Sequence, residues 1–177
     1  MFMSLWPLGT GRTAVTLTHE TPSHGHYYLI PSRLPVIRAS RSHLPQNITL
    51  STKEMVNAAE ASVRTLSIEE ALALHGQDDV IFIDLRDIRE LAKTGRVSGA
   101  RHVPRGMLEF WIDPATSYHK PFFTEDKTFV FYCAGGLRSA LAAKVAQEMG
   151  LSPVAHIAGG MAAWLTANGP IETLKQN

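Results

Sequence analysis

The stretch TFVFYCAGGLRSALAAKVAQEMG, residues 128–150, decides the fold of this chain. It begins with a continuous β-branched and aromatic run over residues 128–132, which is typical of a strand buried on both faces. It ends with residues 139–149, whose apolar side chains recur at helical spacing before Gly150 provides a stop signal. Between these two segments lies a short loop with two glycines. A buried strand, a tight loop and a helix in this order predict one unit of a parallel α/β sheet.

The same alternation of strands and helices continues along the chain. Four further apolar runs predict short strands, at residues 63–66, 80–84, 100–103 and 154–157. Helical patterns separate these runs, and one of them opens with the capping box Ser67-Ile68-Glu69-Glu70. The alternation predicts an α/β fold with a central, mainly parallel five-stranded sheet and helices on both faces.

The bulk composition narrows the classes of function. The 177 residues suffice for one good core, and the hydrophobic share of 45% is ordinary for a globular protein. A net charge of +1 gives no reason to expect nucleic acid or a membrane surface as a partner. No run reaches the roughly 18 apolar residues of a transmembrane helix. The single cysteine excludes an internal disulfide and a cysteine-rich zinc site, and it fits a reducing, cytoplasmic location best.

Residues 1–52 differ in character from the rest of the chain. They carry a net charge of +3, from four arginines and one glutamate, and they show no sustained helical or strand periodicity. We therefore predict a low-order N-terminal extension over residues 1–55 and one domain over residues 56–177. Three interpretations of the extension stay open: a targeting segment, a disordered arm, or an over-long start with Met55 as the true initiator.

Three polar or reactive side chains fall at the carboxyl ends of predicted strands: Asp84, His102 and Cys133. In parallel α/β sheets, this edge is where ligands bind and reactions occur. Cysteine is nucleophilic as the thiolate, and its ordinary pKa of about 8.5 has to be lowered for reaction at neutral pH. The sequence therefore directs attention to the surroundings of Cys133.

The loop after Cys133 offers three ways to stabilise a thiolate. The helix that begins at about Ser139 aims the positive end of its dipole at the loop. Gly135 and Gly136 allow successive backbone N–H groups to turn inward, and Arg138 adds a permanent cation. The same surroundings would stabilise a persulfide anion. The alternative is that Cys133 is a small, unreactive core residue.

Four segments, in one order over residues 62–170, resemble the motifs of the rhodanese-like single-domain sulfurtransferase family. They are Asp84-Leu85-Arg86-Asp87, Gly95-Arg96-Val97-Ser98-Gly99-Ala100, Cys133-Ala134-Gly135-Gly136-Leu137-Arg138-Ser139 and Gly159-Gly160-Met161-Ala162-Ala163-Trp164. Arg96 and Ser98 depart from the family pattern, in which histidine and proline occupy those positions.

The resemblance implies a rhodanese fold and a role for each matching residue. Cys133 would be the nucleophile that forms a persulfide, with Arg138 as a second catalytic residue. Substrate-binding residues would be Ala134, Gly135, Gly136, Leu137, Ser139 and Arg86. The implied partners are a small anionic sulfur donor such as thiosulfate and an acceptor, either cyanide or a thiol. The resemblance implies no metal and no organic cofactor, and we expect a monomer or a weak dimer.

Two other functions share the fold. Rhodanese-like phosphatases, and by extension arsenate reductases, also use a cysteine, a loop and an arginine, with five residues between the cysteine and the arginine. Here four residues, Ala134 to Leu137, lie between Cys133 and Arg138, and the smaller ring favours one sulfur atom over a tetrahedral oxyanion. A non-catalytic binding module is the third reading, although such modules often lack the cysteine.

Further candidates near the strand ends have structural interpretations as well. Arg101 and Arg105 flank His102 in a basic cluster that would attract an anionic donor or simply face solvent. His102 could serve as a base for Cys133, although the family transfers sulfur without one. Leu108, Phe110 and Trp111 would line the pocket or pack in the core, and Trp164 is expected in the core.

Overall fold

The computed structural model describes residues 46–173 of the chain. Most of the predicted extension, residues 1–45, therefore lies outside the described residues. The helices are α1 (Thr52–Glu60), α2 (Ile68–Leu74), α3 (Ile88–Thr94), α4 (Leu108–Ile112), α5 (Leu137–Glu148) and α6 (Gly160–Thr166), with short 3-10 turns at Arg105–Met107 and Pro121–Thr124. The strands are β1 (Arg64–Leu66), β2 (Val80–Asp84), β3 (Arg96–Val97), β4 (Arg101–His102), β5 (Thr128–Tyr132), β6 (Val154–Ile157) and β7 (Ile171–Glu172).

The prediction of a parallel five-stranded sheet is confirmed. The strand order is β1-β6-β5-β2-β4, and every neighbouring pair in this sheet is parallel. Asp84 at the end of β2 pairs in register with Tyr132 at the end of β5. The register therefore brings the ends of these strands to the same edge of the sheet. The sequence reading did not anticipate the short antiparallel pair β3-β7, whose two-residue strands are too short for a periodic pattern.

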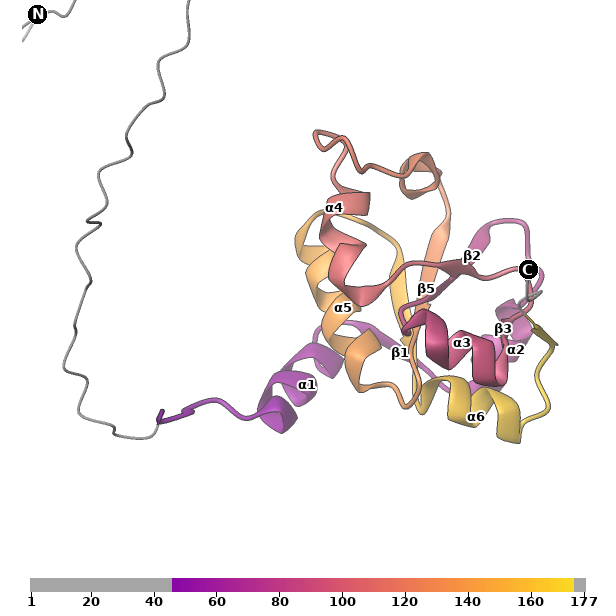
Figure 1. The fold of residues 1–177 in the computed structure, drawn as a ribbon, viewed down its shortest axis with the longest axis horizontal. Helices are drawn as coiled ribbons and strands as arrows, with labels where there is room; N and C mark the ends of the chain where they lie inside the picture. The colour runs from indigo at the N-terminus through magenta and orange to yellow at the C-terminus, as the bar shows by residue number, and fades with distance from the viewer. Residues whose placement is uncertain (1–45, 174–177) are drawn as a thin grey trace, which may run out of the picture. The chain divides into compact units, whose positions relative to one another are not determined.

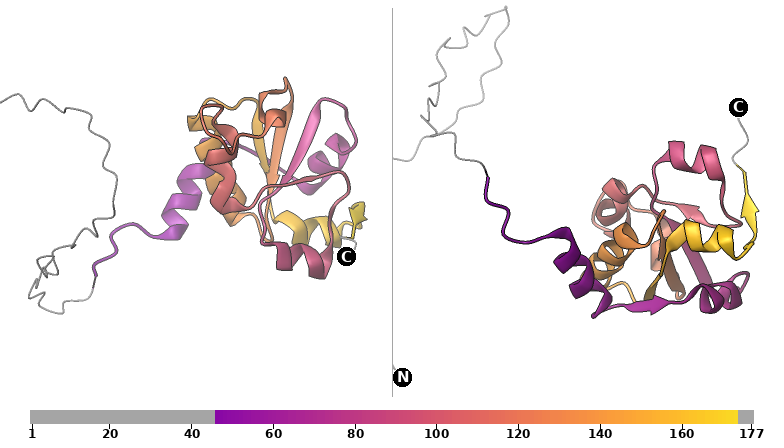
Figure 2. Two further views of the ribbon diagram at one scale, coloured as in Figure 1. Left: turned by 45° about the horizontal axis from the view of Figure 1, so that its top comes forward. Right: turned by 90° about the horizontal axis from the view of Figure 1, so that it is seen from below.

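Each face of the sheet is covered by its own group of helices (Figures 1 and 2). The alternation of side chains along β5 supplies both cores, since successive residues of a strand point to opposite faces. Phe129, Phe131 and Cys133 belong to the core that includes alanines of α5 and Leu108 of α4. Val130 and Tyr132 belong to the other core, which includes Met161 and Trp164 of α6 and Ala71 of α2. The expected core position of Trp164 is confirmed, since it is fully buried.

Helix α1 begins before the predicted domain boundary at residue 55. Ser51 caps its N-terminus in a capping box with Glu54, and the buried faces of Val56 and Ala59 pack with Ala140 of α5. Residues 51–55, expected in the low-order extension, thus include the first turn of a helix that packs on the domain.

One helix start differs from the sequence prediction, and it follows directly after the loop of Cys133. Helix α5 begins at Leu137, because Gly136 adopts a left-handed φ of 97° and serves as the N-cap. Leu137, Arg138 and Ser139 are therefore the first turn of α5 and not part of the loop. Helix α3 begins at Ile88, directly after the segment Asp84–Asp87 as expected, because Asp87 caps it through a third capping box.

Candidate active site

Cys133 lies directly after β5, where the loop to α5 begins, and only 1% of its surface is exposed. The backbone N–H of Gly136 donates a hydrogen bond of 3.2 Å to its Sγ. The first-turn N–H groups of α5 follow immediately, and such groups have no partners within their own helix. The sulfur therefore lies beside backbone N–H groups that can donate hydrogen bonds, and such an arrangement favours an anion.

The carbonyl groups of the loop are turned toward α6. The N–H of Met161 donates to the carbonyl oxygen of Cys133 at 2.7 Å, and the N–H of Ala162 donates to that of Ala134 at 3.0 Å. Because these carbonyls are occupied on the α6 side, they do not present negative partial charge to Sγ. Helix α6 thus fixes the orientation of the loop peptides.

The glycine pair Gly159-Gly160 makes this contact sterically possible. Both residues have positive φ, 71° and 54°, which favours glycine. A Cβ at Gly160 would overlap the carbonyl oxygen of Cys133 and lie 3.0 Å from the nitrogen of Gly136. A Cβ at Gly136 would in turn lie 3.1 Å from the nitrogen of Gly159. Three glycines therefore allow the close approach of α6 to the loop.

Arg138 is held in a two-pronged ion pair with Glu90 of α3. Its Nη1 and Nη2 each donate to one carboxylate oxygen of Glu90, at 2.8 Å in both cases. The Arg138 hydrogen bonds lower the pKa of Glu90 to about 2, and the same bonds, with a smaller contribution from Cys133, raise the pKa of Arg138. The predicted catalytic arginine is thus beside the cysteine, with its charge offset by a carboxylate.

Arg86, predicted to bind substrate, has its guanidinium in a buried network and is 2% exposed. Its Nε and Nη2 donate to the carboxylate of Asp84, with the shortest bond at 2.6 Å, while Nη1 donates to Thr94 Oγ1 at 2.8 Å and Nη2 to the carbonyl of Gly95 at 2.7 Å. These bonds tie the end of β2 to the end of α3. Arg86 thus has a structural use in this geometry, and its role in substrate binding stays a prediction.

The remaining predicted loop residues are distributed over the surface and the core. Gly135 and Leu137 are exposed, and Ala134 is half-buried. Ser139 is fully buried, and its Oγ donates to the carbonyl oxygen of Gly136 at 2.9 Å, which stabilises the first turn of α5. Ser139 therefore shapes the loop from behind.

The basic cluster after β4 is engaged in other contacts. His102 Nε2 lies 2.9 Å from the carbonyl oxygen of Arg86, so this ring nitrogen bonds to the backbone and not to Cys133. Arg105 pairs with Glu109 at 2.7 Å, and Arg101 stacks over the ring of Phe122. Leu108 is buried in the same core as Cys133, which fits the packing interpretation, whereas Phe110 is 51% exposed.

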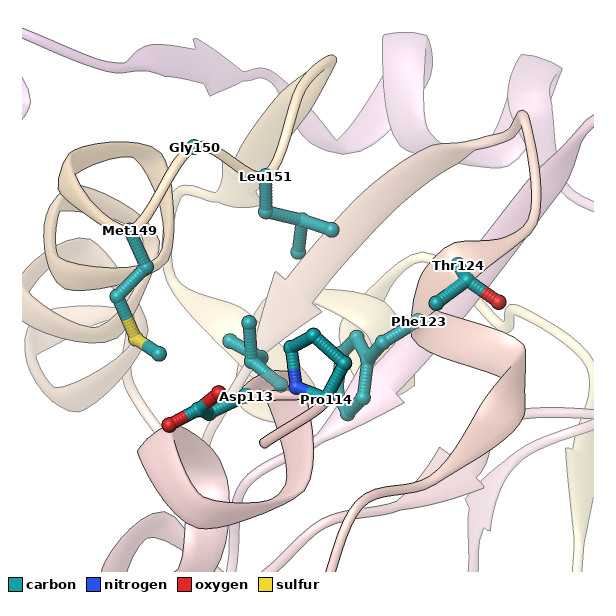
Figure 3. Close-up of a pocket in the computed structure, with 8 residues that line it drawn as sticks. Asp113, Pro114, Phe123, Thr124, Met149, Gly150 and Leu151 are labelled. Atoms are coloured by element: carbon teal, nitrogen blue, oxygen red, sulfur yellow. The ribbon is translucent and has the colours of Figure 1, made fainter. Parts of the chain in front are cut away.

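Two pockets are relevant to the position of the site, because one adjoins the loop of Cys133 and the other does not. A mainly apolar groove of about 230 Å³ adjoins the loop at Ala134 and runs between α3 and α6; it is lined also by the predicted substrate-binding residue Arg86 and by Glu90, Lys93, Met161 and Leu165. The pocket in Figure 3 is different: Met149, Gly150 and Leu151 line it after the C-terminal end of α5, together with Asp113 and Phe123. Since the 12-residue helix α5 separates the two ends by about 18 Å, that pocket lies away from Cys133.

Residues 46–173 contain no cluster of three or more side chains suited to hold a metal ion. No helix in the described part of the chain is long and apolar enough to cross a membrane.

Glu90 is the site residue that sequence reasoning missed. The segment Asp87-Ile88-Arg89-Glu90 carries a capping-box pattern that would have placed Glu90 in the first turn of a helix. No local pattern predicts its partner Arg138, because the two residues are 48 positions apart in the chain.

Comparison with known proteins agrees with this fold. The model of the rhodanese-like domain family matches residues 67–167. The human thiosulfate:glutathione sulfurtransferase is 31% identical over 112 residues, which are 59% of this chain and 96% of the human protein. A tRNA uridine(34) hydroxylase from Cronobacter sakazakii is 29% identical over 96 residues, which are 54% of this chain and only 27% of the hydroxylase.

Among solved structures, a protein of unknown function from Rhodopseudomonas palustris, described as a possible tyrosine phosphatase, is 58% identical. It superposes with a TM-score of 0.71 and covers 73% of this chain and 99% of its own. The family match over residues 67–167 agrees with the parallel sheet, and this chain belongs to the rhodanese-like domain family.

Proposed function

We propose that the protein is a sulfurtransferase that moves a sulfane sulfur through a persulfide on Cys133. The observation that carries the proposal is the 3.2 Å hydrogen bond from the Gly136 N–H to Cys133 Sγ, in a loop whose carbonyls are bonded to α6. A site in which a backbone N–H donates to the sulfur, and two loop carbonyls are bonded elsewhere, suits an anionic sulfur. Cys133 must be reduced to react, which fits the cytoplasm.

In the first half-reaction, the Cys133 thiolate attacks the outer sulfur of the donor. With thiosulfate, a new S–S bond forms to Cys133, the S–S bond of the donor breaks, and sulfite leaves with the bonding pair. The negative charge then rests on the outer sulfur of the Cys133 persulfide. The Gly136 N–H and the N-terminus of α5 lie where they would stabilise this charge.

In the second half-reaction, a nucleophilic acceptor attacks the outer sulfur of the persulfide. Cyanide would leave as thiocyanate, and a thiolate would leave as a persulfide; in both cases the Cys133 thiolate is restored. Arg138 would offset the negative charge, which is carried in turn by the donor, the persulfide and the leaving group. Neither half-reaction needs a metal or an organic cofactor.

Hydrolysis of a phosphate ester is the second candidate, because the 58% identical Rhodopseudomonas protein is described as a possible tyrosine phosphatase. Two features of this chain weigh against it. Only four residues separate Cys133 from Arg138, which makes a small ring, and the arginine that would bind phosphate is paired with Glu90. A binding module without catalysis would leave the donor arrangement around Sγ unused.

The proposal is tested by treating the purified protein with thiosulfate and analysing the Cys133 peptide by mass spectrometry. We expect an increase equal to one sulfur atom, and thiocyanate on addition of cyanide, with both lost in Cys133→Ser. If neither the adduct nor thiocyanate is formed, the sulfurtransferase proposal fails. Aryl-phosphate hydrolysis that disappears in Cys133→Ser would support the phosphatase instead.

A further inference from the structure

Glu90 is fixed between two helices that meet beside the nucleophile. As the third residue of α3, its Oε2 accepts a hydrogen bond of 3.1 Å from the backbone N–H of Asp87, in a capping box. The same carboxylate accepts one hydrogen bond from each Nη of Arg138, which lies in the first turn of α5. Because it is bonded on both sides, the carboxylate has a defined position and is more than a mobile surface charge.

The negative charge of Glu90 therefore lies at the approach to Cys133. Arg138 follows the cysteine by five residues and lies in the first turn of the helix that begins after the loop. Glu90 also lines the groove that adjoins the loop at Ala134. An anion that approaches the sulfur from this side meets the Arg138–Glu90 pair and not an isolated cation.

Four charged groups border this approach: Arg138 of α5, Glu90 and Lys93 of α3, and Arg86, which follows β2. The guanidinium of Arg86, although also positive, is directed into the bonds with Asp84, Thr94 and Gly95. Glu90 is thus the negative member of the set, and its removal would leave the approach more strongly positive.

We propose that Glu90 is a specificity-determining residue that, by neutralising Arg138, limits the attraction of multiply charged anions to Cys133. With Arg138 neutralised, the site would favour a dianionic donor over a monoanionic donor less strongly than a site with an unpaired arginine would. The application to sulfur donors rests on the sulfurtransferase function proposed above, whereas the effect on the charge around Cys133 does not.

The test uses two alkylating reagents of similar size and different charge. Iodoacetate is an anion and iodoacetamide is neutral; with both, the thiolate displaces iodide and forms a thioether. Since Cys133 is the single cysteine of the chain, the rate of its alkylation is read directly from the intact mass. We expect Glu90→Gln to raise the ratio of the iodoacetate rate to the iodoacetamide rate about fivefold, the size of a partly exposed charge interaction. The increase should shrink at high salt, because exposed charges are screened.

Two matched variants separate charge from structure. Glutamine at position 90 can still accept the capping hydrogen bond, so Glu90→Gln removes the charge and keeps the cap. Glu90→Asp keeps the charge and should retain the ratio of the unmodified protein. Glu70→Gln changes the equivalent capping residue of α2 and should leave the ratio unchanged. An unchanged ratio in Glu90→Gln, or an equal rise in Glu90→Asp, would overturn the inference.

A steady-state kinetic experiment tests whether Glu90 has the same effect on the choice of sulfur donor. Thiosulfate carries two negative charges and methanethiosulfonate carries one, and each delivers a sulfane sulfur with sulfite or methanesulfinate as the leaving group. Glu90→Gln should lower the KM for thiosulfate more than that for methanethiosulfonate, with kcat nearly constant. If no thiocyanate is formed from either donor, the proposed function fails while the alkylation ratio still decides the role of Glu90. If both donors turn over and their KM ratio is unchanged, the inference fails alone.

Discussion

The carbonyl oxygen of Cys133 accepts a hydrogen bond of 2.7 Å from the backbone N–H of Met161, the second residue of α6. This bond joins Cys133 to a glycine motif that is distant in the sequence. Since the peptide after Cys133 is oriented by this contact, the position of the Gly136 N–H depends on how closely α6 approaches. The Gly159-Gly160 pair is therefore part of the active-site architecture.

The first prediction concerns Gly160. In Gly160→Ala, the new Cβ would overlap the carbonyl oxygen of Cys133 at a φ of 54°, so we expect a loss of about 2–4 kcal/mol in the free energy of unfolding. Alkylation of Cys133 by iodoacetamide should also change, because the loop must move. Urea unfolding measures the first effect. Gly135→Ala, in the same loop with open space around its Cβ position, is the control; equal losses in both variants would contradict the steric argument.

Those parts of the site that consist of residues close together in the chain could be predicted from the sequence. The run of β5, the glycine loop and α5 are contiguous, so the position of Cys133 at a strand end followed from spacing alone. The ion pair of Arg138 with Glu90 and the contact of Gly160 with Cys133 join segments that are far apart in sequence. A single sequence contains no local signal for such pairs, so these contacts required the structure.

Arg86 shows that a polar residue after a strand end can also serve the fold. A polar side chain after a strand end suggested substrate binding, and only the bonds to Thr94 and Gly95, in addition to Asp84, reveal the structural use of the guanidinium. The helix start at Leu137 was missed for a related reason, since the left-handed φ of Gly136 moves the cap two residues earlier than the apolar periodicity indicated.

The second prediction follows from the Arg86 network. Arg86→Lys keeps the charge but cannot reach Asp84, Thr94 and Gly95 together, because an ammonium lacks the planar fork of donors. We expect a loss of about 1–3 kcal/mol in unfolding free energy, with sulfur transfer by the folded protein retained. Arg89→Lys, in the exposed pair with Asp87, should cost at most about 0.5 kcal/mol. A stable Arg86→Lys protein with a much higher KM for thiosulfate would support the substrate-binding role.

The third prediction concerns the start of α1. A chain that begins at Met55 lacks Ser51 and Glu54, so the first turn of the helix loses its capping box. We expect it to be about 1–2 kcal/mol less stable than a chain that begins at Gln46, with Ser51→Ala in the longer chain accounting for about 1 kcal/mol of this difference. Urea unfolding of the three proteins provides the measurement. Equal stability of the two shortened chains would show that the α1 cap is dispensable.

The fourth prediction concerns the stability of the fold in mild acid. His156 on β6 is fully buried; its Nε2 lies 2.9 Å from Thr65 Oγ1, and its Nδ1 has no hydrogen-bond partner among residues 46–173. Burial lowers the pKa of His156, and the charge of Glu60 opposes this only in part. The folded protein thus binds this proton less readily than the unfolded chain, in which a histidine titrates near about pH 6.5.

Stability from this residue is therefore complete above about pH 6.5 and is lost as the pH falls below that value, with a slope that approaches about 1.4 kcal/mol per pH unit. Urea unfolding between pH 5 and pH 8 should show this loss, and His156→Gln, which cannot take up the proton, should show a shallower decline. Because the other seven histidines of the chain remain in both proteins, the difference between the two curves reports His156 alone. Parallel curves for the two proteins would mean that the His156 ring is protonated as easily in the fold as in water.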